Sequence, residues 1–452
     1  MNLTPLYPDA ARNFDQRAEA LVGLLELRVE ETTPDSFDPD IHINGSIPYS
    51  DLIDFEQFHR DFLGREDARF FRHGNNWVGF SGSSYQEFTQ LARSMQKTQS
   101  LRNTVSESLV CKSLFKWLKG RYFVQSLPPM TTFVLDECGR EVVEDLQIWI
   151  PISNLRVETA FEIGRVVLRP MHKEMFDRWE SQVQAHAKNE ADRTNIKLGI
   201  DRRRHRFQGD AAATITLTAD VARASEIGRE YADQAISTLR FFSVASLTPH
   251  EVSYTDLSGL QHEDRHNYFA VDKEGRIGYG SGFAQNTKPW MLGIAEFNRI
   301  HSGGLNILSA LLKKTKPSRF QQDTISAVRS YSKAALSKDV SLKFVYILIA
   351  LESVFLRDNK EPIGSNIKDR LAFLIGTSKG ERKDIAQTLA KCYELRAAFL
   401  HHGRPITIDD LEVVESFVVF AWRSIAQLIQ LAADDQITIE RLFEDLDDRK
   451  WK

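Results

Sequence analysis

The stretch SLKFVYILIALESVFLRD, residues 341–358, carries the strongest folding signal of the chain. Its apolar residues recur at positions 344, 347, 348, 351, 354 and 355, which is the i, i+3, i+4, i+7 spacing of a helix with one buried face. Glu352 falls inside this apolar run. The stretch therefore predicts a core helix that carries one carboxylate within its buried segment.

Further helical patterns lie on both sides of this core helix. An amphipathic helix is expected before it, and three more after it, the last beginning at the capping residue Thr407 with acidic residues in its first turn. The expected segments are 318–337, 366–376, 380–403 and 406–432. Together they predict a compact up-and-down helical bundle within residues 291–452.

The rest of the chain has a mixed character. Residues 1–120 are predicted to be mainly helical, with a helix over 84–117 that Gly120 caps and a loop over 31–48. Residues 121–290 are predicted to be rich in β-structure because they contain short runs of Val, Ile, Thr and aromatic residues between turn residues. The expected strands are 121–125, 131–137, 144–152, 159–171 and 211–221, with a charged helix or excursion over 172–200 and a helix over 229–246. The expected fold class is therefore α+β, in three domains.

Composition is that of a soluble globular protein. The chain has 452 residues, 42% hydrophobic and 27% charged, with a formal net charge of −4, which argues against a histone-like polyanion binder but leaves room for a local basic groove. Cys111, Cys138 and Cys392 form no CxxC pair, as expected in a reducing compartment. We see no signal peptide and no apolar run long enough to span a bilayer. A cytoplasmic protein without a membrane partner is expected.

Familiar catalytic motifs are incomplete. GYGSG at 278–282 lacks the Lys and Ser/Thr of a phosphate-binding loop and is expected to be a flexible turn. GFSGS at 79–83 ends in Ser83 where a nucleophile elbow needs Gly. Neither HExxH nor a kinase set occurs. We therefore expect no metal, no cofactor and no serine hydrolase chemistry in the middle domain.

Two basic runs are candidates for nucleic-acid contact. RRRHRF at 202–207 contains Arg202, Arg203, Arg204 and Arg206 beside a phenylalanine, and such a run either lies in a solvated loop or binds a phosphate backbone while stacking a base. KKTKPSR at 313–319 contributes Lys313 and Lys314. Neither run is specific alone.

The stretch YELRAAFLHHG at 393–403 raises the question of function. Helical spacing runs 385, 389, 392, 396, 399, so Arg396 lies on the core-facing stripe and needs either a carboxylate, for which Glu352 is the first candidate, or an anionic ligand. His401 and His402 close the helix before Gly403, where the negative end of the helix dipole favours the imidazolium form.

Arginine and histidine without a metal are sufficient for phosphodiester transfer, since one binds the phosphate and the other moves protons. Arg396 and His401 are five residues apart, about 140° around a helix, so they do not face each other. The helix end or a second subunit must complete such a site. The alternative is that Arg396 bonds Glu352 structurally and the histidines only end a helix.

These residues resemble a known family. The run AVRSYSKAALSKDVSLKFVYILIALESVFL, the helix with Arg370 and the stretch YELRAAFLHHG look like the HEPN superfamily, specifically the ApeA-like HEPN domains of bacterial defence proteins. The family motif is Arg followed four to six residues later by His, commonly as Tyr-x-x-Arg-polar-x-x-x-His-Gly. Tyr393, Arg396 and His401 match it, and Glu352 matches an acidic residue of an earlier helix. The resemblance covers residues 318–435.

The resemblance implies a metal-independent endoribonuclease that works as a homodimer and leaves a 2′,3′-cyclic phosphate. Arg396 would hold the scissile phosphate, His401 would act on the 2′-hydroxyl or the leaving oxygen, and Tyr393 would contact RNA. Family members serve as toxins or abortive-infection effectors, so an antitoxin or a phage-derived trigger is an expected partner.

Two departures from the motif leave alternatives open. Ala397 replaces the usual polar residue, and the usual His-Gly appears as His401-His402-Gly403, so that His402 is also a candidate for the catalytic histidine. The second hypothesis is therefore a non-catalytic HEPN module that dimerises and binds RNA, a nucleotide or a protein.

Overall fold

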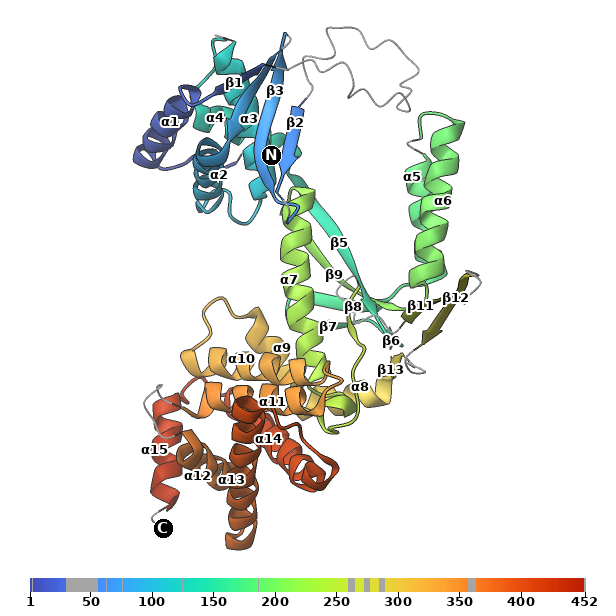
Figure 1. The fold of residues 1–452 in the computed structure, drawn as a ribbon, viewed down its shortest axis with the longest axis vertical. Coiled ribbons are helices and arrows are strands. Elements are labelled where there is room, and N and C mark those ends of the chain that lie inside the picture. Colours follow the sequence, from blue (N-terminus) through green and yellow to red (C-terminus); the bar gives the residue numbers. More distant parts are fainter. Residues whose placement is uncertain are drawn as a thin grey trace. The chain divides into compact units, whose positions relative to one another are not determined.

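The computed structural model describes residues 1, 3–29, 56–61, 63–74, 76–123, 125–185, 187–258, 265–271, 277–283, 289–356 and 363–450. It combines helices and strands, and its C-terminal region is helical (Figure 1), which confirms the mixed class expected. The chain forms two compact units, one of residues 1–148 and 216–227, the other of residues 149–215 and 228–452. The boundaries expected at residues 120 and 290 stay predictions, and the loop expected over 31–48 lies outside the described residues.

The first unit combines a four-stranded antiparallel sheet with four helices. The sheet has the order β1-β4-β3-β2 and consists of β1 (Glu26–Val29), β2 (Glu56–Arg60), β3 (Glu66–His73) and β4 (Asn76–Ser81). The helices are α1 (Pro8–Val22), α2 (Gly82–Gln96), α3 (Glu107–Tyr122) and α4 (Met130–Glu141). Aromatic side chains from the sheet and the helices meet in one core, where the Phe80 and Phe88 rings stack at 5.4 Å.

The strands expected at 121–125 and 131–137 are wrong. Helix α3 continues to Tyr122, and α4 covers the whole of the second segment. Buried side chains at Met130, Val134 and Cys138 recur every four residues, which is a helical period that the β-branched composition concealed.

Gly120 is not a helix cap either. It is buried inside α3, and an added Cβ would lie 2.6 Å from Leu127 Cδ1. The lack of a side chain at Gly120 therefore allows the segment that follows α3 to pack closely against the helix.

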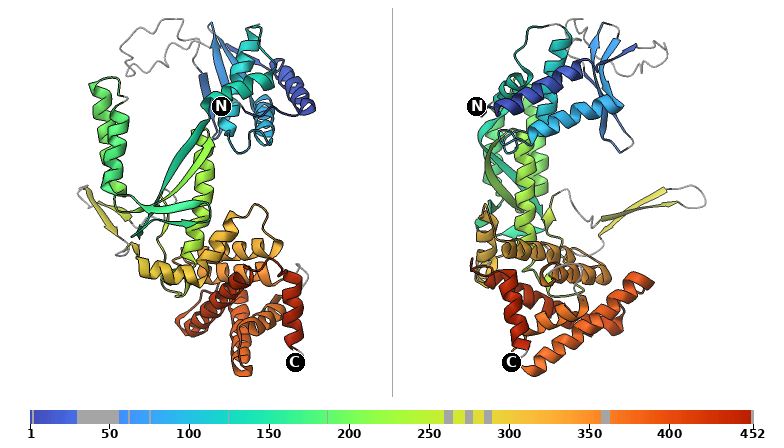
Figure 2. Two further views of the ribbon diagram at one scale, coloured as in Figure 1. Left: turned by 180° about the vertical axis from the view of Figure 1, so that it is seen from behind. Right: turned by 90° about the vertical axis from the view of Figure 1, so that its left-hand side faces the viewer.

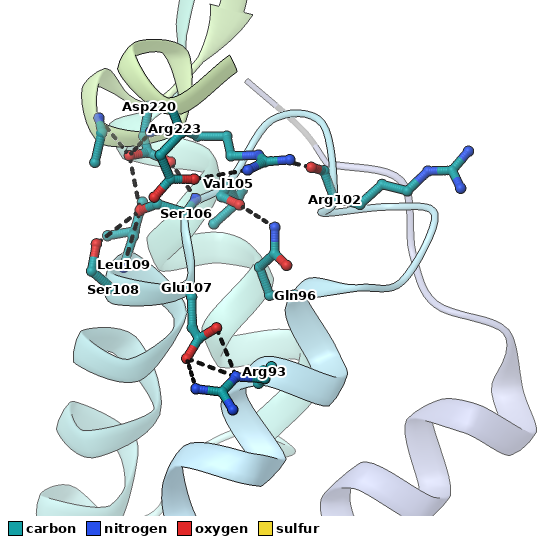
Figure 3. A network of polar contacts seen from close by, with 12 residues as sticks. Arg93, Gln96, Arg102, Val105, Ser106, Glu107, Ser108, Leu109, Asp220 and Arg223 are labelled. Carbon is teal, nitrogen blue, oxygen red and sulfur yellow. Dashed lines mark hydrogen bonds and ion pairs between the residues drawn. The ribbon is translucent and has the colours of Figure 1, made fainter. Parts of the chain in front are cut away.

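A buried carboxylate joins two helix starts in the first unit (Figure 3). Asp220 accepts hydrogen bonds from the Ser106 amide at 2.6 Å and the Ser106 hydroxyl at 3.0 Å. It also accepts from the amides of Ala222 and Arg223, at 3.0 and 3.2 Å. Ser106 caps α3, and Asp220 precedes α7 (Val221–Arg240). One side chain therefore satisfies amides at the N-termini of both helices.

The second unit contains a five-stranded sheet of order β10-β5-β9-β8-β7. Its strands are β5 (Val143–Ser153), β7 (Phe161–Ile163), β8 (Val166–Pro170), β9 (Ala211–Ala219) and β10 (Asp256–Leu257). The expectations for 144–152, 159–171 and 211–221 are thereby confirmed. The unit boundaries fall within β5, β9 and α7, so these three elements carry the chain from one unit to the other.

Smaller elements accompany this sheet. β6 (Leu155–Val157) pairs in parallel with β13 (Trp290–Leu292), and β11 (Arg265–Val271) pairs with β12 (Ile277–Phe283). GYGSG lies in β12, so the turn expected there is wrong. Between β8 and β9 the chain forms a helical hairpin of α5 (Lys173–Gln184) and α6 (Glu190–Phe207), seen in green in Figures 1 and 2. This hairpin is the charged excursion that the sequence predicted.

The C-terminal helices confirm the expected series. The elements are α8 (Ile294–Ile300), a π-helical turn (His301–Leu305), α9 (Asn306–Lys313), α10 (Arg319–Ala334), α11 (Val340–Phe355), α12 (Ile363–Ile375), α13 (Lys379–His402), a 3₁₀ turn (Ile408–Asp410), α14 (Leu411–Leu431) and α15 (Ile439–Lys450). Helices α9 to α15 contribute buried side chains to one hydrophobic core. On α11 the buried positions include Phe344, Ile347, Leu348, Leu351, Val354 and Phe355, as the spacing predicted.

A buried lysine ties this core to the segment after α7. Lys343 is 2% exposed, and its ammonium donates to the carbonyls of Ala245 and Thr248, each at 2.9 Å, and of Glu251 at 2.5 Å. Burial lowers the pKa of Lys343 to about 8. Three carbonyl acceptors offset part of the lost hydration of the ammonium group.

We expect Asp220→Ala to lower the unfolding free energy by about 3–5 kcal/mol, because several donors at two helix starts lose their acceptor. Urea unfolding monitored by circular dichroism measures the change. Glu226→Gln is the control, because Glu226 is exposed and bonds only the outer end of Arg223. A loss no larger than that of the control would show that Asp220 does not organise this junction.

We expect Lys343→Met to lower the unfolding free energy by about 3–5 kcal/mol, since buried carbonyls lose their donor. The native pKa of about 8 lies below the ordinary 10.5, so the unfolded chain binds more protons between these values. Wild-type stability should therefore rise with pH across this window, relative to the variant. Urea unfolding from pH 7 to 10.5 tests both statements, and a difference that shrinks with pH would contradict the second.

Candidate active site

Helix α13 ends where the sequence predicted. Gly403 has the left-handed φ of 64°, a conformation that glycine adopts with little strain. Its amide donates to the Phe399 carbonyl at 3.0 Å, and the Arg404 amide donates to the Ala398 carbonyl at 3.2 Å. This cap places His401 and His402 in the last helical turn.

The residues of the apolar stripe on α13 become more exposed toward the C-terminal end of the helix. Ile385, Leu389 and Cys392 are fully buried, whereas Arg396 retains 28% side-chain exposure and Phe399 is half-buried. Arg396 therefore lies at the margin of the core, with its stem shielded and part of its guanidinium accessible.

Arg396 pairs with Glu352 of α11. The distances are 3.3 Å from Nη1 to Oε1 and 3.3 Å from Nη2 to Oε2, which is a side-by-side approach of guanidinium and carboxylate. Glu352 is the more buried partner, with 16% side-chain exposure. The contact that helical spacing predicted between these two residues is present.

A tyrosine hydroxyl completes a small polar cluster, which we define as Glu352, Tyr393 and Arg396. The Tyr393 hydroxyl and Glu352 Oε1 are both buried and lack a hydrogen-bond partner of good geometry among the described residues. Burial raises the pKa of Glu352, and Arg396 and the Tyr393 hydroxyl offset this rise only in part. Burial and the Glu352 charge together raise the pKa of Tyr393. The cluster thus has unused hydrogen-bonding capacity at the edge of the core.

Tyr393, which the sequence predicted to contact RNA, lies mostly inside the protein. Its ring packs against the C-terminal core, and an added Cβ at Gly364 would lie 3.9 Å from Tyr393 Cδ2. Its hydroxyl is buried beside Glu352. In this arrangement the tyrosine contacts the carboxylate that orients Arg396, and the RNA contact remains a prediction.

His401 and His402 are both exposed, with ring centroids 6.5 Å apart. Neither imidazole forms a hydrogen bond or ion pair with a described residue, so both rings are accessible to a ligand. Five residues separate Arg396 from His401, about 7.5 Å along the helix axis. One protomer therefore offers an anion-binding group and proton-transfer groups at two levels of one helix.

The basic run at 202–207 is helical, so the loop reading of this run is wrong. Its residues form the last turns of α6. Arg204 binds Asp177 and Glu180, each at 2.9 Å, and Asp201 at 3.0 Å. Arg202, Arg203 and Arg206 are exposed.

Lys313 and Lys314 already have anionic partners. Lys313 binds Glu162 at 2.5 Å, and Lys314 binds Asp435. Such surface pairs are weak, and an RNA contact by these lysines must compete with them.

Sequence reasoning missed a polar cavity of about 860 Å³ in the first unit. Arg69, Tyr85, Arg93, Glu107 and Cys111 are among its lining residues. No motif pointed to it, because the lining residues range from Asp61 to Glu226 along the sequence. Four of its five carboxylates are bound by arginines, as in the Arg69–Glu66 and Arg93–Glu107 pairs at 2.9 and 3.1 Å.

In the part of the chain that the structure describes, no group of three or more His, Cys, Asp or Glu side chains is placed to hold a metal ion. Within the same residues, every helix is too short or too polar to cross a bilayer.

Comparison with known proteins gives no relative for this chain. No protein family, no curated protein and no solved structure matches it.

The pH dependence of stability tests the polar cluster. The pKa of Glu352 is raised above its ordinary 4.5, so the native state holds this proton more tightly than the unfolded chain. Relative to Glu352→Gln, the wild type should therefore lose stability as pH rises from 4.5 through the native pKa. Urea unfolding between pH 4 and 8 measures this, with exposed Glu394→Gln as control. A wild type that gains stability over this range would show that Arg396 outweighs burial.

Proposed function

We propose that this chain is a metal-independent HEPN endoribonuclease that acts as a toxin or anti-phage defence effector. The observation that carries the proposal is a partly exposed arginine, held by a buried carboxylate, one and a half turns before two exposed histidines at a helix end. These are the groups that phosphodiester cleavage without a metal requires.

The proposed reaction uses the polar cluster and the two histidines. Arg396 binds the scissile phosphate, and Glu352 orients its guanidinium while Tyr393 flanks the carboxylate. One histidine accepts the 2′-hydroxyl proton, the 2′-oxygen attacks phosphorus, and the P–O5′ bond breaks. The leaving 5′-oxygen takes a proton from the other imidazole. The products are a 2′,3′-cyclic phosphate and a 5′-hydroxyl.

We further propose that the active form is a homodimer. Arg396 and His401 do not face each other on one helix, so a two-fold axis near the end of α13 would bring two sets of groups together. Leu342, Tyr346 and Ile349 support this arrangement, because they are 46%, 39% and 44% exposed at i, i+4 and i+7 on α11. An apolar stripe of this kind on the helix that carries Glu352 is suited to a subunit interface.

A non-catalytic HEPN module is the second candidate. Two observations favour it: Glu352 already neutralises Arg396 in the structure, and Ala397 supplies no polar group to the site. In this alternative the bundle dimerises and binds RNA, a nucleotide or a protein without cutting. The nuclease proposal includes two further expectations. An antitoxin or a phage-derived trigger would control the protein, and the protein would be located in the cytoplasm.

Cleavage of a structured RNA in EDTA separates the two candidates. We expect the wild type to leave cyclic-phosphate ends. Arg396→Ala, which removes the phosphate-binding charge, and His401→Ala/His402→Ala, which removes the acid–base groups, should each lower the rate at least about 100-fold. The single histidine variants show which imidazole is required. Arg404→Ala is the control, because it removes an exposed charge of the same sign next to Gly403.

Intact RNA with a folded, dimeric wild type would favour the binding module. Equal losses in Arg404→Ala and Arg396→Ala would contradict the assignment of the site. Circular dichroism and light scattering on each variant exclude unfolding and dissociation as causes.

A further inference from the structure

The helical hairpin of α5 and α6 has little core of its own. Helix α6 contains no buried residue, and α5 contributes the buried Phe176. A small cluster joins the hairpin to the strands, in which Trp149, Trp179, Ile200 and Phe207 are half-buried. The two helices lie side by side in both Figure 1 and Figure 2. Most of the α6 surface is thus available to solvent.

Arg204 accounts for the orientation of α6 on α5. It binds two carboxylates of α5 and one of its own helix, and its side chain is 23% exposed. Both Nη atoms of this guanidinium thus have carboxylate partners, whereas its buried Nε has none among the described residues. Arg204 is therefore a structural residue and is not available to a ligand.

Arg202 and Arg206 point to the other side of α6. Each lies two residues from Arg204, about 200° around the helix, and both are exposed. Neither forms an ion pair with a described residue. Arg203 is also exposed and gives one hydrogen bond, to the Gly199 carbonyl at 3.0 Å. We name Arg202, Arg203 and Arg206 the arginine face of α6.

The arginine face carries a small electrostatic cost that a bound anion would remove. Like charges at i and i+4, as at Arg202 and Arg206, destabilise a helix by about 0.2–0.5 kcal/mol. The helix dipole favours cations in the last turn, but Arg202 lies before that turn. The face lacks the carboxylates that neutralise Arg204. An anionic partner would supply that compensation.

An aromatic ring accompanies these arginines. The Arg206 guanidinium lies 5.1 Å from the Phe207 ring centroid, and Phe207 is half-buried. Arginines beside partly exposed rings are typical of surfaces that bind single-stranded nucleic acid.

We propose that the arginine face of α6, with the ring of Phe207, binds single-stranded RNA. The arginines contact consecutive phosphates, and the Phe207 ring stacks on an unpaired base. This inference rests on the proposed function, because the hairpin would bind the same RNA that the HEPN site cuts. Of the four arginines in the basic run, only Arg202, Arg203 and Arg206 are then RNA-binding residues, since Arg204 holds α6 on α5.

Fluorescence anisotropy with a labelled single-stranded RNA tests the proposal on the full chain carrying Arg396→Ala, in EDTA, so that binding is measured without cleavage. The variant is Arg202→Gln/Arg206→Gln. The matched control is Arg102→Gln/Lys112→Gln, which removes the same charge from exposed positions in the first unit. Figure 3 shows the Arg102 side chain extending away from the polar network there.

We expect the arginine-face variant to bind RNA at least about tenfold more weakly than the control, and its slope of log K against log salt to fall by about 1.4, the value for two lost contacts on a single strand. Duplex RNA of equal length should bind more weakly than the single strand, because its paired bases cannot stack on the Phe207 ring.

Equal affinity of variant and control would overturn the proposal, as would a parent protein that does not bind RNA. Equal binding of duplex and single strand would overturn the stacking contacts. An unmutated chain that binds RNA through this face but never cuts it would leave the inference standing and refute the nuclease.

Discussion

The pairing of Arg396 with Glu352 is the constraint on which the candidate site depends. Arg396 cannot lose its charge and lies on a stripe that is otherwise apolar. The nearest compensation is a carboxylate on α11, which is itself half-buried. The pair fixes the Arg396 guanidinium beside Glu352 and Tyr393, where α13 meets α11. The Gly403 cap then sets how far beyond Arg396 the helix continues, and so where the two histidines lie.

Helical elements were predictable wherever apolar spacing was long and regular. The series from α10 to α14 followed from periodicity, and the Arg396–Glu352 contact followed from the stripe on α13. The strands expected at 121–125 and 131–137 failed because Thr, Phe and Val resemble a strand by composition, while the burial of Met130, Val134 and Cys138 has a helical period. Local composition competes with tertiary packing in such short segments.

Other features depend on residues that the sequence keeps apart. Arg204 differs from its neighbours only because Asp177 and Glu180 of α5 approach it, and no spacing within 202–207 contains that information. The partners of Lys343 are carbonyl groups, which every residue possesses, so composition cannot identify them. The buried hydroxyl of Tyr393 likewise depends on how α12 packs on α13.

Asp220 has a consequence for the order in which the chain folds. Its carboxylate completes the start of α3 across 114 positions of sequence, and the intervening residues 149–215 belong to the second unit. During synthesis, which proceeds from the N-terminus, Ser106 leaves the ribosome long before its acceptor. The Ser106 hydroxyl can cap α3 at once, but the Ser106 amide lacks its carboxylate acceptor until the hairpin of α5 and α6 and strand β9 have been made.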